Sequence, residues 1–105
     1  MSGGRFDYKQ YDLQHIAEEI NQVIHEFERG DKSEWGDYPK WNFENPQTIA
    51  EFRYAIKMLN IALIYAQRID WLLSGDDGEE NFHTRLKLDL EIAAAIEKVE
   101  GEVMP

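Results

Sequence analysis

Hydrophobic residues recur along this chain at spacings of three and four, the period of an α-helix with one buried face. The first such stretch covers residues 13–29, and its apolar positions are Leu13, Ile16, Ala17, Ile20, Val23, Ile24 and Phe27. Asp12 precedes it as a candidate N-cap, and Gly30 follows it where helices commonly end. The pattern predicts a helix over 13–29 that packs on one side.

The stretch 45–74 predicts the longest helix. Asn45 suits an N-cap, Pro46 suits the first helical position, and Gly75 suits the end. Its broad apolar stripe consists of Ile49, Phe52, Ala55, Ile56, Leu59, Ala62, Leu63, Ala66, Ile69 and Leu73. A second stripe beside it consists of Tyr54, Met58, Ile61, Tyr65 and Leu72. Because two stripes need cover from two sides, we expect this helix to be central.

A third helix is expected after a turn at 74–78. Asp77 followed by Glu80 has the spacing of a capping box. The expected inner face consists of Phe82, Leu86, Leu88, Ile92, Ala93, Ile96 and Val99. Apolar residues alternate strictly over 86–92, as in a strand, so a strand is the alternative there. The intervening charged residues are poor strand formers, and the alanines at 93–95 favour helix.

Together these elements predict one all-α domain over 1–105, a three-helix antiparallel bundle with a long central helix. Residues 1–11 are expected to form a partly ordered arm and 101–105 a loose tail. The first helix is too short to cover the whole central helix. We therefore expect a homodimer through the second stripe, at Tyr54, Met58, Ile61 and Tyr65, or through Trp71 and Leu72.

The connection over 31–45 is longer than the usual 2–8 residues between bundle helices. It contains four aromatic residues: Trp35, Tyr38, Trp41 and Phe43. Such a loop either covers the core as a lid or presents a contact surface. The lid is favoured because exposed tryptophans lower solubility, and the contact surface is the alternative.

Charge narrows the class of partner. The chain has 21 acidic and 11 basic residues, a net charge of −10. This charge disfavours direct binding to nucleic acid or to anionic membranes and permits a basic protein partner. The chain has no cysteine, which excludes disulfides and thiolate sites. With no long apolar run and no signal-like N-terminus, we expect a cytoplasmic protein.

Catalytic signatures are sparse, and neither a metal nor another cofactor is expected. Carboxylates precede His15 and His83 by three residues, a spacing used in di-iron bundles, but both stand at helix starts, where capping explains them. MazG-like nucleotide pyrophosphatases pair an ExxE with an ExxD motif around magnesium. Only Glu97 and Glu100 match that pattern, without a partner motif. We therefore expect no enzyme.

Asp70 is an acid at a core-facing angle of the central helix. A buried carboxylate needs a partner, and a hairpin turning at 75–78 brings residue 83 opposite it. We expect Asp70 to pair with His83, with Arg85 as the other candidate. The narrow polar side of this helix carries a basic patch that consists of Arg53, Lys57, Arg68 and Trp71. This patch pairs either with nearby acids or with an anion or acidic partner.

These patterns predict a small acidic non-enzymatic helical protein that acts through protein–protein interaction, including inhibition of a basic nucleic-acid-binding partner as an acidic mimic. One alternative is a small-ligand or nucleotide-binding helical dimer, and a second is a magnesium-dependent pyrophosphatase-like enzyme. The candidate interaction residues are Trp35, Tyr38, Trp41, Tyr54, Met58, Tyr65, Arg68 and Trp71.

Overall fold

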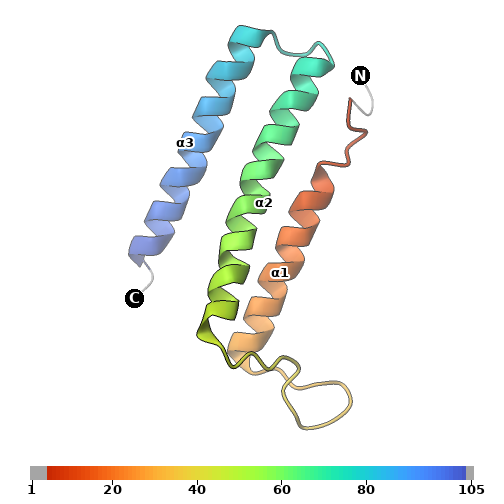
Figure 1. Ribbon diagram of the computed structural model, residues 1–105, viewed down its shortest axis with the longest axis vertical. Helices are drawn as coiled ribbons and strands as arrows, with labels where there is room; N and C mark the ends of the chain where they lie inside the picture. The colour runs from red at the N-terminus through yellow and green to blue at the C-terminus, as the bar shows by residue number, and fades with distance from the viewer. Residues whose placement is uncertain (1–4, 104–105) are drawn as a thin grey trace. The chain divides into compact units, whose positions relative to one another are not determined.

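The computed structural model describes residues 5–103, with side chains as far as Ile96, and contains three helices (Figure 1). They are α1 (Tyr11–Arg29), α2 (Pro46–Leu73) and α3 (Glu79–Val103). Among residues 5–103 there is no strand, only an isolated bridge between Lys32 and Pro39. The predicted all-α, three-helix fold is confirmed. Residues 1–4 of the expected arm and 104–105 of the expected loose tail lie outside the described residues, whereas 101–103 belong to α3.

Contacts divide the chain into two compact units. Residues 12–60 form one unit, which contains nearly all of α1 and the first half of α2. The N-terminal residues to Tyr11 join the chain from Ile61 onward in the other unit, which contains the second half of α2 and all of α3. The helix α2 therefore contributes to both units.

Local chemistry explains the helix ends. The Asn45 side-chain oxygen accepts a hydrogen bond from the Gln47 N–H at 2.9 Å, as an N-cap does. Gly30 and Gly75 have φ of 71° and 84°, a left-handed conformation that L side chains adopt at a cost. The Gly30 N–H donates to the Phe27 carbonyl at 3.1 Å. Both predicted helix ends are confirmed.

The third helix begins differently from the prediction. The Phe82 N–H donates to the carbonyl of Gly78 at 2.9 Å, which makes Gly78 the residue that opens α3. Asp77 therefore does not cap the helix, because its carboxylate is engaged by arginines instead. Residues 86–92 are helical, so the strand alternative is wrong.

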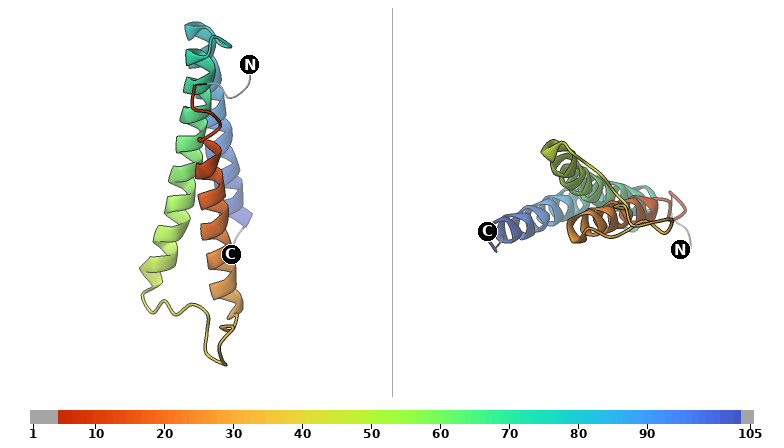
Figure 2. Two further views of the ribbon diagram at one scale, coloured as in Figure 1. Left: turned by 90° about the vertical axis from the view of Figure 1, so that its right-hand side faces the viewer. Right: turned by 90° about the horizontal axis from the view of Figure 1, so that it is seen from below.

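In the unit over 12–60, the buried apolar residues are Ala17 and Ile24 on α1. At the lower end of the view, the chain leaves α1, crosses the long loop and enters α2 (Figure 2, left). Phe43 in this loop packs between two helices, with ring centroids 5.2 Å from Phe27 on α1 and 5.3 Å from Phe52 on α2. This aromatic cluster closes the loop end of the unit.

In the other unit, the face of α3 that is half-buried differs in part from the expected inner face. The half-buried apolar residues are Phe82, Leu86, Leu90 and Ala93. Leu88, Ile92 and Ile96 were expected inside but are exposed by 53%, 49% and 55%. The alternating pattern over 86–92 puts apolar side chains on two sides of the helix, and the unit covers only one of them.

Candidate interaction surface

Residues 31–40 form a closed, hairpin-like loop. The Ser33 N–H donates to the Tyr38 carbonyl at 2.9 Å, and the Lys40 N–H donates to the Asp31 carbonyl at 2.8 Å. These bonds join the two arms of the loop, as a ladder joins two strands. The loop therefore has a defined shape, which its sequence did not predict.

The tip of this loop holds two outward-facing aromatic residues. Trp35 is 85% exposed and Tyr38 is 55% exposed. The backbone N–H of Trp35 donates to the Ser33 hydroxyl at 3.2 Å. A Cβ built on Gly36 would lie 2.8 Å from the Tyr38 ring, so this ring lies directly against the glycine. The tip is thus packed internally while its aromatic faces remain in solvent.

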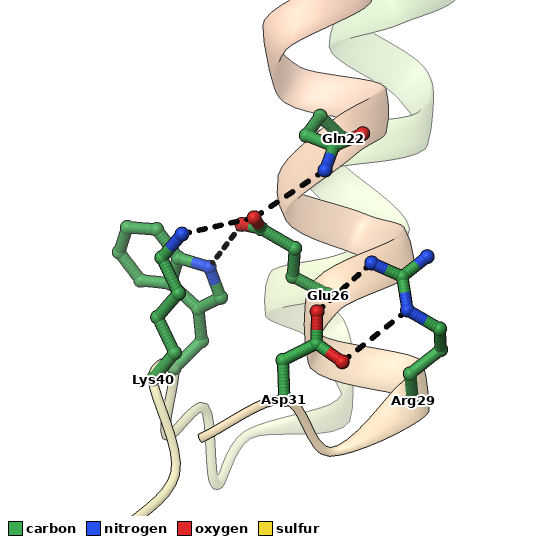
Figure 3. A network of polar contacts seen from close by, with 6 residues as sticks. Gln22, Glu26, Arg29, Asp31 and Lys40 are labelled. Atoms are coloured by element: carbon green, nitrogen blue, oxygen red, sulfur yellow. Dashed lines mark hydrogen bonds and ion pairs between the residues drawn. The ribbon is translucent and has the colours of Figure 1, made fainter. Parts of the chain in front are cut away.

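Glu26 on α1 anchors the returning arm of the loop, which contains Lys40 and Trp41 (Figure 3). Its carboxylate accepts hydrogen bonds from the Trp41 indole at 2.8 Å, the Lys40 amine at 2.9 Å and the Gln22 amide at 3.3 Å. The side chain is only 13% exposed. The hydrogen bond from Trp41, followed by that from Lys40, lowers the pKa of Glu26 to about 2.

A second polar contact holds the departing arm of the loop, which begins at Asp31. The Arg29 guanidinium donates to both carboxylate oxygens of Asp31, at 3.2 Å and 2.9 Å (Figure 3). This two-point contact lowers the pKa of Asp31 and raises that of Arg29. Both arms of the loop are therefore fixed to the end of α1.

The lid and the contact surface each describe part of this loop. Trp41 and Phe43 are half-buried against the helices, as a lid requires. Trp35 and Tyr38 do not cover the core, so the lid interpretation is wrong for the tip. Sequence reasoning treated the four aromatics as one group and could not separate them.

On α2, the candidate residues of the second stripe are partly open to solvent. Tyr54, Met58 and Tyr65 are exposed by 56%, 37% and 42%, and Ile61 between them is half-buried. They follow one another at intervals of four, three and four residues, so they lie along one side of the helix.

Arg68, another candidate, is engaged within the chain. Its Nε donates to Asp89 at 2.7 Å, and its guanidinium lies 4.7 Å from the centre of the half-buried Trp71 ring. The Asp77 carboxylate, 4% exposed, lies 3.7 Å from the Arg68 Nη1 and accepts a bond from Arg85 at 3.1 Å. Elsewhere on the same patch, Arg53 pairs with Glu28 on α1. These arginines therefore pair with nearby acids, as one of the two interpretations of the basic patch predicts.

Asp70 is buried, as its wheel angle predicts, with 5% exposure. Its Oδ1 accepts hydrogen bonds from the backbone N–H groups of Arg5 and Phe6. His83 is exposed and lies edge-on to Phe82, with ring centroids 5.1 Å apart. The structure therefore does not bring Asp70 and His83 together: the N-terminal arm supplies the partners instead.

The same arm makes a second contact with α2. The Gln10 side chain, also 5% exposed, donates to Gln67 at 2.7 Å. Between the two contacts, Asp7 and Tyr8 have φ of 55° and 64°, a conformation uncommon for residues other than glycine. The arm of residues 5–10 is thus an ordered element with a specific turn.

Comparisons with family models, curated proteins and solved structures gave no match. Over the part of the chain that the structure describes, no three His, Asp or Glu side chains gather closely enough to hold a metal ion. None of the helices in that part is both long and apolar enough to cross a bilayer.

Proposed function

We propose that this chain is a non-enzymatic interaction protein, an acidic antiparallel three-helix bundle that self-associates and binds a basic protein partner. The observation that supports this best is the apolar surface left open on ordered elements. Solvent reaches large apolar side chains on α2, on α3 and at the loop tip. Such patches on soluble proteins usually mark contact sites.

The proposed self-association is a homodimer through the second stripe of α2. Tyr54, Met58, Ile61 and Tyr65 have the alternating spacing of a coiled-coil seam. No carboxylate occurs in the sequence between Glu51 and Asp70, so two copies of this acidic chain can approach there without facing acids. A stable dimer buries about 800 Å² on each partner, so further apolar residues must join the seam.

Light scattering coupled to size-exclusion chromatography tests the dimer. We expect a dimer at micromolar concentration and a monomer for the double variant Tyr54→Glu, Tyr65→Glu. The matched control is Tyr38→Glu, because Tyr38 is as exposed as Tyr54 but lies on the loop. If the wild-type chain is monomeric at micromolar concentration, the dimer is wrong.

The proposed partner is a basic protein, because the chain has a net charge of −10. The sharper form of this proposal is an acidic mimic that occupies a nucleic-acid-binding site in the cytoplasm. A pull-down from the native host with mass spectrometry tests it: the captured protein should be basic and should be released by competing DNA or RNA. Capture of acidic proteins alone would contradict the proposal.

No observation favours the two alternatives of ligand binding and pyrophosphatase activity. The pyrophosphatase alternative rests on Glu97 and Glu100, which lie outside the residues whose side chains are described. A small-ligand site would use a pocket between the aromatic loop and α2. Of the loop tryptophans, Trp35 is turned to solvent and Trp41 is hydrogen-bonded to Glu26.

A further inference from the structure

The loop tip of residues 33–38 combines high exposure with a fixed shape. Trp35 is exposed by 85%, more than any other large hydrophobic residue described. Tryptophan is enriched among the residues that dominate binding energy in protein interfaces. An indole this exposed contributes little to the core of its own chain. A partner that covers it would therefore gain the free energy of burying the indole.

The tip is also organised before any partner arrives. The Ser33 hydroxyl accepts the Trp35 N–H, the Tyr38 ring lies on Gly36, and the Lys32 amine donates to the Asp37 carbonyl at 3.2 Å. Glu26 holds the returning arm through two donors. These contacts already fix the loop. Binding a partner therefore costs less conformational entropy than it would with a flexible loop.

The charges beside the tryptophan select the partner. Glu34 precedes Trp35, and Asp37 follows it two residues later; both are exposed. Two exposed carboxylates within two residues of an exposed tryptophan disfavour a nucleic acid, whose phosphates they would repel. They favour a protein surface with Lys or Arg around an apolar centre.

We propose that residues 33–38 form a docking element for a protein surface whose apolar centre is bordered by Lys or Arg. The inference rests on the proposed interaction function and names its site and the chemistry of its partner. The docking element shares no residue with the α2 seam.

A defined probe tests the site: an amphipathic peptide of leucine and lysine, whose apolar face is bordered by positive charge. We expect Trp35→Ala to weaken its binding to the full chain about tenfold or more. Replacing Glu34 and Asp37 by Gln and Asn should also weaken it. Isothermal calorimetry gives the affinities, and circular dichroism confirms that each variant is folded.

Two matched pairs of variants separate the tip from the rest of the surface. Tyr38→Ala should weaken binding and Tyr54→Ala should not, although the two residues are exposed by 55% and 56%. Gly36→Ala should weaken binding because its new Cβ displaces the Tyr38 ring. Gly78→Ala should not, since a Cβ there meets open space.

The site is wrong if Trp35→Ala and Tyr54→Ala bind the leucine–lysine peptide equally, or if a leucine–glutamate peptide binds as well. Failure of the site is distinguishable from failure of the interaction function. If Trp35→Ala still captures the basic host protein, the interaction function stands and the docking element lies elsewhere. If the wild-type chain neither dimerises nor captures a host protein, both the interaction function and the docking element are wrong.

Discussion

Glu26 illustrates how much one side chain determines at the end of α1. Its carboxylate fixes Lys40 and Trp41, which lie fourteen and fifteen residues away in the chain. The sequence could not predict this, because Glu26 lies off the apolar stripe and looks like an ordinary solvated acid. Only the fold of the loop brings the indole N–H to it. Residue-level contacts between a helix and an irregular loop have no periodic signal.

The lowered pKa of Glu26 predicts a pH dependence. Above a pH of about 4.5 the group is ionised in both folded and unfolded chains, so its full stabilising contribution is present. As the pH falls toward the folded pKa of about 2, that contribution is lost. We therefore expect the difference in free energy of unfolding between wild type and Glu26→Gln to shrink between pH 4.5 and 2, measured by urea denaturation.

The control for this experiment is Glu19→Gln, an exposed acid on the same helix. It should show no comparable change, since no Glu19 contact is lost. A constant difference for Glu26→Gln across this pH range would mean that the carboxylate does not hold the loop. Fluorescence of Trp41 gives an independent signal, because the hydrogen bond from its indole weakens when the Glu26 carboxylate loses its charge.

At the scale of elements, the sequence predicted the helix starts and ends that depend on single residues and their own backbone. Asn45 and Pro46 start α2, and Gly30 and Gly75 follow helix ends, because each acts on its own backbone. The burial of Asp70 also followed from its helical angle. The hydrogen-bond partners of Asp70 could not be predicted in this way, because the arm donates backbone N–H groups, which every residue except proline has. For the same reason the arm showed no pattern in its sequence.

The contact between the arm and α2 predicts a cost of roughly 1–3 kcal/mol for Asp70→Ala, since two part-buried N–H groups lose their acceptor. Asp70→Asn should cost less, because its amide oxygen still accepts. His83→Ala should change the free energy of unfolding little, and its effect should add to that of Asp70→Asn within about 0.5 kcal/mol. Urea denaturation measures the three single variants and the double variant Asp70→Asn, His83→Ala. Strong coupling between positions 70 and 83 would restore the pairing expected from the sequence.

At the scale of the whole molecule, net charge and apolar surface act in opposite directions. The net charge of −10 opposes the approach of a second copy, whereas the open apolar side chains on α2 favour it. The same charge attracts a basic partner. The two proposed interactions therefore differ in the sign of their electrostatic component.

This difference predicts opposite responses to salt. Raising NaCl screens the repulsion between copies, so the dimer should become tighter, while binding of the leucine–lysine peptide should become weaker. Analytical ultracentrifugation measures the first and calorimetry the second, on the same preparation. If both interactions weaken with salt, self-association depends on attraction between charges and not on the apolar seam.

The contact at Asp70 also sets which sequence changes the arm can tolerate. The carboxylate binds main-chain N–H groups, so it places no requirement on the exposed side chain of Arg5. Proline is the exception, because it has no N–H to donate. Natural variants of this chain should therefore be free in side-chain chemistry at position 5 and should avoid proline at positions 5 and 6.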